Sequence, residues 1–94
     1  KDYMDDIRNR AHATAHLTYS LEDVLDERSR EFYCEGYRRT DLIRYGLYDT
    51  DEYVWPYKGG DSFAGRSFPA YKNIFPLPPT ELAVNSDLIQ NPGY

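Results

Sequence analysis

The sequence predicts a mainly α-helical fold: a helical hairpin from a tetratricopeptide-like α/α architecture over residues 1–46, then a long irregular carboxy-terminal segment. Three observations predict it. Apolar residues recur at spacings of three and four before Gly46, as on one face of a helix. After Gly46 this periodicity is lost among aromatic residues, glycines and aspartates. Near the end, Pro76, Pro78 and Pro79 exclude a regular helix through their positions.

The first helix is expected over roughly residues 2–15. One face of it carries the apolar residues Met4, Ile7, Ala11 and Ala15. A break at "HLTYS" follows, so a short loop joins this helix to the next. Two antiparallel helices joined in this way form the hairpin from which tetratricopeptide-like solenoids are built.

The second helix is expected over residues 21–45. Ser20 stands before its first apolar residue and Asp23 follows three positions later, which is the pattern of a capping box. Gly46 suits the left-handed conformation in which many helices end. Gly36 falls inside this helix, where we expect it to admit the close approach of another backbone.

This second helix carries charged residues within its apolar stripe. Arg28, Glu35 and Arg39 fall in the same register as leucines and Phe32. Buried charges persist only when they are paired and hydrogen-bonded. We therefore expect a structural ion-pair network, packed under other parts of a larger protein, among the residues Arg28, Glu31, Glu35, Arg38 and Asp41.

Two further segments complete the expected organisation, and all of them belong to one larger domain. Residues 47–74 are expected to form a variable aromatic loop, and residues 75–94 an extended, proline-rich closing segment. Within the closing segment, a single helical turn capped by Thr80 runs to Val84. Residues 91–93, Asn-Pro-Gly, form a turn just before the chain end.

Three rings of the aromatic loop are candidate ligand-binding residues: Tyr53, Trp55 and Tyr57. They stand beside Lys58 and Asp61 in the sequence. Flat rings next to polar groups suit a sugar-binding platform, because the C–H faces of pyranoses stack on aromatic faces. Two other interpretations stay open. The rings pin an irregular segment to the helices, or they contact a protein partner.

Composition and motifs disfavour several other functions. The net charge is −5 and no Lys/Arg-rich run lies outside the charged helix, so no nucleic-acid partner is expected. No apolar run approaches the roughly 20 residues that cross a bilayer. His12 and His16 have the spacing of two zinc ligands but lack a third, so no metal is expected. No glycine-rich phosphate loop is present, and no cofactor is expected.

No catalytic residue is expected either. Cys34, the single cysteine, has no histidine and asparagine placed by the sequence to act with it as catalytic partners. It is interpreted as a buried small hydrophobic residue. Glu27, Glu31 and Glu35 follow one another along one helix among arginines, whereas a glycosidase needs two carboxylates that face each other across a cleft. The glycosidase alternative predicts hydrolysis that loss of Glu31 or Glu35 removes.

Two blocks of the sequence resemble the SusD/RagB family. Within residues 27–46, "ERSRE", "EGYR" and "DLIRYG" follow the pattern of that family's late helix in the same order. Within residues 75–94, "FPLP" and "QNPGY" are similar to its closing segment. The chain departs from the family at Tyr37, where a histidine or another ring is frequent, and at Thr40, where an aromatic residue is frequent.

The resemblance implies the carboxy-terminal part of a non-enzymatic nutrient-binding protein, lipid-anchored on the outer-membrane cell surface of Bacteroidetes-type bacteria. Such proteins capture glycans or other nutrients and act with a SusC-like TonB-dependent transporter. The family's lipid-bearing cysteine lies at its amino terminus, so Cys34 is not the anchor, and membrane association comes only through an anchor absent from this chain. The alternative is a helical-repeat module for protein–protein interaction with no small-molecule ligand.

Overall fold

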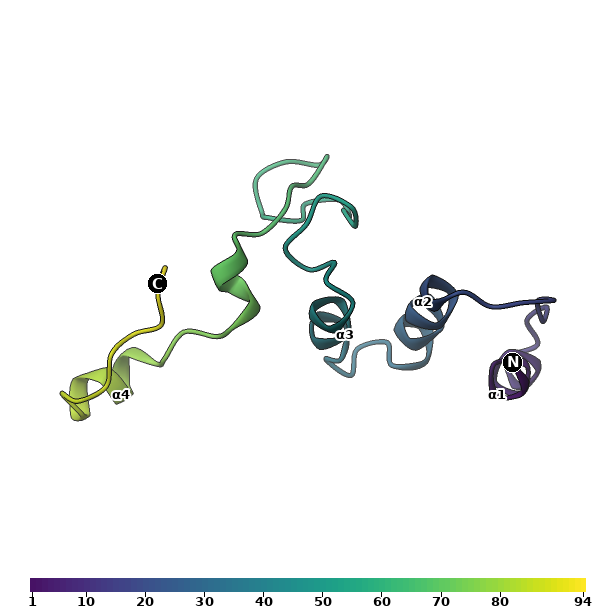
Figure 1. Cartoon of the computed structure of the whole chain (residues 1–94), viewed down its shortest axis with the longest axis horizontal. Helices are drawn as coiled ribbons and strands as arrows, with labels where there is room; N and C mark the ends of the chain where they lie inside the picture. Colours follow the sequence, from purple (N-terminus) through teal and green to yellow (C-terminus); the bar gives the residue numbers. More distant parts are fainter. The chain divides into compact units, whose positions relative to one another are not determined.

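The computed structural model describes all residues, 1–94, and is mainly helical, which confirms the predicted fold class. It contains four α-helices, one 3₁₀ helix and no strand (Figure 1). In chain order these are α1 (Asp2–Arg10), α2 (Leu21–Glu31), α3 (Arg38–Arg44), η1 (Ala70–Asn73) and α4 (Pro79–Val84). The chain divides into two compact units, Lys1–Asp41 and Leu42–Tyr94, and each is described by itself.

Helix α1 is shorter than the expected range 2–15 and ends at Arg10. His12 has a left-handed φ of 54°, which an α-helix does not accommodate. The Arg8 guanidinium donates from Nε to the carbonyl oxygen of Thr14 at 2.7 Å, and this bond holds the chain after the helix in its irregular path. The apolar residues Ala11 and Ala15 continue the helical spacing in the sequence, but they lie beyond the end of α1.

The capping box predicted at the start of α2 is confirmed. The backbone N–H of Asp23 donates to the Ser20 hydroxyl oxygen at 3.1 Å, and the backbone N–H of Ser20 donates to Asp23 Oδ2 at 2.8 Å. The bond from Ser20 lowers the pKa of the Asp23 carboxyl, because it stabilises the charged form. Two backbone donors at the helix start are thus satisfied by residues of the helix start itself.

The prediction of a single long helix over residues 21–45 is wrong, because an irregular segment at 32–37 separates α2 from α3. Within it, Cys34 has a φ of 64° and Gly36 a φ of 80°, and left-handed residues interrupt a right-handed helix. A Cβ built on Gly36 meets no atom within 4 Å. The glycine is therefore explained by its backbone conformation and not by the expected close approach. Cys34 is exposed, and its interpretation as a buried residue is also wrong.

The end of α3 confirms the role predicted for Gly46. This glycine has a φ of 69°, and its N–H donates to the carbonyl oxygen of Ile43 at 3.0 Å. The next N–H, from Leu47, donates to the carbonyl oxygen of Leu42 at 2.9 Å. These two bonds form a Schellman motif, which satisfies carbonyls that the helix end would otherwise leave unpaired.

The closing segment contains the turn predicted at residues 91–93. The N–H of Tyr94 donates to the carbonyl oxygen of Asn91 at 3.3 Å, and Gly93 has a φ of 96°. Proline followed by a left-handed glycine is the pattern of a type II turn. The ring of Tyr71 lies against Gly93, where a Cβ would come within 2.6 Å of its Cγ, so any side chain at this position would displace the ring. Helix α4 begins at Pro79, its N-cap is Pro78 and no side chain caps it, so the cap predicted at Thr80 is wrong. The expectation that Pro79 excludes a helix is also wrong, because proline fits the first turn of a helix, where its missing N–H is not needed.

Side chains of the "QNPGY" motif fasten the chain end to residues 74–77. The Gln90 amide accepts from the backbone N–H of Leu77 at 2.8 Å and donates to its carbonyl oxygen at 3.0 Å. The Asn91 amide donates to the carbonyl oxygen of Phe75 at 2.8 Å, and the Tyr94 hydroxyl donates to that of Ile74 at 2.7 Å. These three side chains thus form hydrogen bonds with backbone groups of an extended segment that has no neighbouring strand to pair with.

Candidate functional site

Of the five residues expected to form a charged network, the structure brings Arg28 and Asp41 together. The Arg28 guanidinium donates from Nε to Asp41 Oδ2 at 2.9 Å and from a terminal nitrogen to Oδ1 at 3.0 Å. Such a two-pronged pair fixes both the distance and the orientation of the partners. Asp41 is only 2% exposed, so this bidentate contact compensates for the free-energy cost of removing its carboxylate from water.

The other three residues of that expected set find different surroundings. Arg38 donates to the carbonyl oxygen of Leu25 at 2.8 Å and lies 3.6 Å from a carboxylate oxygen of Asp26. Glu31 pairs with Arg10 of α1. Glu35 is exposed on the irregular segment after α2, because the helix that would have turned it inward ends at Glu31.

A second buried pair was missed by sequence reasoning, which did not assign Arg8 to any site. Glu27 is 4% exposed and accepts from Arg8 at 2.8 Å and from Arg30 at 2.7 Å, through the same oxygen. Its partner Arg8 lies on α1, so no spacing within α2 could have indicated the contact. With Glu31 bound to Arg10 as well, these glutamates serve as ion-pair partners between the helices.

The three candidate rings of the aromatic loop fall into two groups. Tyr53 and Trp55 are half-buried, with ring centroids 6.2 Å apart, and Trp55 lies 6.0 Å from the ring of Phe68. Tyr57 is 62% exposed and meets Phe63 edge to face at 5.8 Å. Tyr53 and Trp55 are thus placed to support the loop, and Tyr57 to present a ring to solvent.

Lys58 is the centre of this loop, a role that sequence reasoning did not assign to it. Its side chain is 1% exposed, and its ammonium donates to three backbone carbonyls, of Leu47 at 3.3 Å, Thr50 at 2.7 Å and Tyr53 at 2.5 Å. The ammonium also lies 5.0 Å from the centroid of the Trp55 ring. An ammonium has three donors, and here each finds an acceptor inside the loop.

The environment of Lys58 also shifts its titration. Burial lowers the pKa of its ammonium from the ordinary value, because removal from water disfavours the charged form, while the carboxylates of Asp51 and Asp49 oppose this shift. Asp51 also accepts the backbone N–H of Ser67 at 3.0 Å. The loop is therefore ordered by a buried cation and by side-chain bonds to its backbone, without secondary structure over most of its length.

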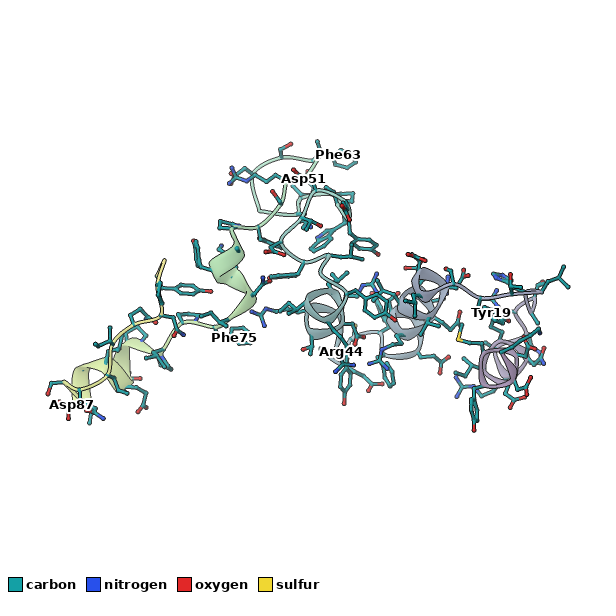
Figure 2. All side chains as sticks on the ribbon, viewed as in Figure 1. Tyr19, Arg44, Asp51, Phe63, Phe75 and Asp87 are labelled. Atoms are coloured by element: carbon teal, nitrogen blue, oxygen red, sulfur yellow. The ribbon has the colours of Figure 1, made fainter.

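The exposed rings of Tyr57 and Phe63 form what we call the aromatic shelf. Tyr57 has a left-handed φ of 64°, which costs a bulky residue on the order of 1–2 kcal/mol. Hydrogen bonds hold it there: its N–H donates to the carbonyl oxygen of Phe63 at 3.4 Å, and its carbonyl accepts from Gly60 at 2.9 Å. Phe63 lies at the outer edge of the loop (Figure 2). The shelf is thus presented to solvent on a held backbone.

The two histidines tested as metal ligands do not form a metal site. His12 and His16 are exposed, and no three histidine, cysteine or acidic side chains converge to hold an ion. None of the helices has the length and apolarity required to span a bilayer. The aromatic loop remains the candidate functional site, because it joins exposed rings to a fixed support.

Comparison with known proteins gives a consistent result along the chain. The model of the SusD family matches residues 1–94. Starch-binding protein SusD from Bacteroides thetaiotaomicron is 39% identical over 92 residues, which make up 97% of this chain and 16% of that protein. The chain thus spans less than a fifth of the length of this relative. On the family match and on this identity, the chain belongs to the SusD family.

Proposed function

We propose that this chain is the carboxy-terminal part of a cell-surface protein that binds a nutrient glycan. Membership in the SusD family supports this proposal, as does the similarity to a protein described as starch-binding. The protein captures an oligosaccharide and delivers it to a SusC-like, TonB-dependent transporter in the outer membrane. It is held at that membrane by a lipid anchor outside this chain.

The observation that carries a binding role for this segment is the aromatic shelf. Tyr57 and Phe63 are 62% and 71% exposed, and a ring that is both exposed and held can receive the C–H face of a sugar at little entropic cost. The Lys58 ammonium lies over the Trp55 ring and donates to the backbone carbonyl of Tyr53, and these contacts keep the loop in shape. Of the three candidate rings, Tyr57 makes the direct contact, while Tyr53 and Trp55 support it.

The proposed function involves binding without catalysis. Two of the three glutamates of the glycosidase alternative are engaged, since Glu27 accepts from two arginines and Glu31 pairs with Arg10, while Glu35 is exposed on the irregular segment after α2. A general acid or a nucleophile must instead be free to reach the substrate. The carboxylates of α2 are therefore assigned to the architecture of the first unit.

The test is calorimetric titration of the full-length protein with neutral oligosaccharides, comparing wild type with Tyr57→Ala. We expect affinity to fall about two- to tenfold, because an aromatic contact is worth about 0.5–1.5 kcal/mol. Tyr3→Ala is the matched control, since Tyr3 is 86% exposed on α1, outside the loop. Unchanged affinity in Tyr57→Ala would remove the shelf from the site. Binding of no glycan, together with no transporter in a pulldown, would overturn the function itself.

A further inference from the structure

A groove of about 450 Å³ opens within the aromatic loop, in the second unit. It combines two cationic side chains with two rings and contains no acidic residue among those that line it. The lining residues are Gly59, Arg66, Ser67, Phe68, Pro69, Tyr71 and Lys72. A concave surface that offers both rings and positive charge is suited to a ligand with an apolar face and a negative group.

We propose that this groove binds the oxyanion of an acidic sugar, a carboxylate or sulfate carried on a pyranose ring. The inference rests on the proposed glycan-binding function and narrows its ligand class. Arg66 offers the planar fork of donors that matches an oxyanion, and Lys72 supplies a second positive charge. Phe68 and Tyr71 provide the apolar wall against which the sugar ring lies.

Arg66 can exchange its present partner for the ligand. It pairs with Asp61, and the two side chains are 65% and 67% exposed. Exposed pairs of this kind contribute at most about 1 kcal/mol, so a ligand oxyanion held between two cations competes with this carboxylate on favourable terms.

Gly59 gives the Arg66 side chain its place along the groove. A Cβ added to Gly59 would lie 2.6 Å from the Cγ of Arg66, and the glycine has a left-handed φ of 78°. No other residue type fits both the backbone and the space. The backbone N–H of Arg66 donates to the carbonyl oxygen of Lys58 at 2.9 Å, so the same buried lysine that orders the loop also anchors this wall.

Other residues that line the groove are fixed as well. The N–H of Ser67 donates to Asp51, and the ring of Phe68 stacks on Tyr48 at 4.7 Å. Tyr71 meets Tyr94 edge to face at 4.8 Å. Binding therefore needs little reorganisation of the groove, which favours affinity.

The experiment compares ligands of equal length in the full-length protein: a galacturonate oligosaccharide, a sulfated oligosaccharide and a neutral malto-oligosaccharide. Calorimetry at low and at moderate salt gives each affinity. We expect at least one acidic ligand to bind more tightly than the neutral one, with an advantage that shrinks as salt rises. The two acidic arms show whether the oxyanion is a carboxylate or a sulfate.

The double variant Arg66→Gln/Lys72→Gln should lose about tenfold or more in affinity for the acidic ligand, because hydrogen bonds to charged groups are worth about 1.5–3 kcal/mol. Its affinity for the neutral ligand should not change. Arg44→Gln removes an exposed arginine of α3 that does not line the groove, and is the matched control.

Each outcome separates this inference from the function on which it rests. Neutral binding with no acidic preference would overturn the groove assignment and leave the glycan function standing. An equal loss of acidic affinity in Arg44→Gln would show unspecific attraction and also overturn it. Binding of no sugar at all would overturn both. Circular dichroism and thermal melting of each variant establish that the fold is retained.

Discussion

Lys58 shows how one residue can order a segment that has almost no secondary structure. Lysine is among the residues least often fully buried, and it is tolerated inside a protein only when its charge is compensated. Here three backbone carbonyls and the Trp55 ring surround the ammonium. The aromatic shelf and the groove wall are both built on the backbone that this lysine holds.

Replacing Lys58 with methionine should destabilise the second unit by about 1–3 kcal/mol. The substitution keeps an apolar stem of similar length but leaves the carbonyls of Thr50 and Tyr53 without their donor. Chemical denaturation of the full-length protein measures the loss, and hydrogen exchange should show it at residues 47–66. Lys72→Met, which removes a less buried lysine, is the control, with an expected change within about 0.5 kcal/mol. Equal stability of both variants would contradict the central role of Lys58.

At the scale of elements, the helix ends are determined by neighbouring residues. The capping box at Ser20 marks the start of α2, and the Schellman motif at Gly46 marks the end of α3. Both depend on residues within a few positions of each other, so the sequence alone located them. The start of α2 therefore offers a local test that does not depend on the rest of the protein.

The stability of the start of α2 should decrease at low pH. The backbone N–H of Ser20 lowers the pKa of Asp23 below its ordinary value of 3.8. Because the folded carboxyl gives up its proton more readily than the unfolded one, its contribution is complete above pH 3.8 and is lost as the pH falls through the lower folded value. NMR titration of the Asp23 carboxyl and the Ser20 amide measures this.

Two variants complete that experiment. Asp23→Asn should weaken the helix start at neutral pH and reduce its loss in acid, because one titrating group is gone while Glu22, whose pKa is also lowered at this helix start, remains. Asp26→Asn removes an acid of the same helix outside the capping box and should leave the acid dependence in place. An unchanged acid response in Asp23→Asn would assign that response to other carboxylates.

The break between α2 and α3 marks what the sequence could not reveal. The apolar stripe stays in register from Leu21 to Leu42, so periodicity alone indicates one helix. Gly36 was the available signal, since an interior glycine weakens a helix, but its left-handed φ of 80° becomes visible only in the structure.

The contacts that build the candidate site were also beyond sequence reasoning. The partners of Lys58 are backbone carbonyls, which every residue carries, and only the path of the loop selects three of them. Similarly, Glu27 meets Arg8 because α1 packs on α2. Tyr57 was identified from composition, but its separation from Tyr53 and Trp55 depends on tertiary packing.

At the scale of the whole molecule, buried charge matters as much as buried apolar surface. Leu25 and Leu42 are the only apolar side chains that are fully buried, while Glu27, Asp41 and Lys58 are buried with their charges. Within the first unit, residues of α1 contact the end of the connection and then α2 in the order of the sequence: Asp5 with Tyr19, Arg8 with Glu27, and Arg10 with Glu31. The ten-residue connection between these helices is long enough to allow that order.

A fold held in this way should respond strongly to the loss of one buried partner. Arg28→Ala leaves the carboxylate of Asp41, 2% exposed, without its bidentate partner, and we expect a loss of about 3 kcal/mol or more in the free energy of unfolding. Arg30→Ala is the matched control. Its side chain is 58% exposed, and Glu27 keeps Arg8 when Arg30 is removed, so the expected loss is below about 1 kcal/mol. Urea denaturation of the full-length protein compares them. A loss in Arg28→Ala no greater than in Arg30→Ala would mean that water reaches Asp41 and that the pair does not hold the unit together.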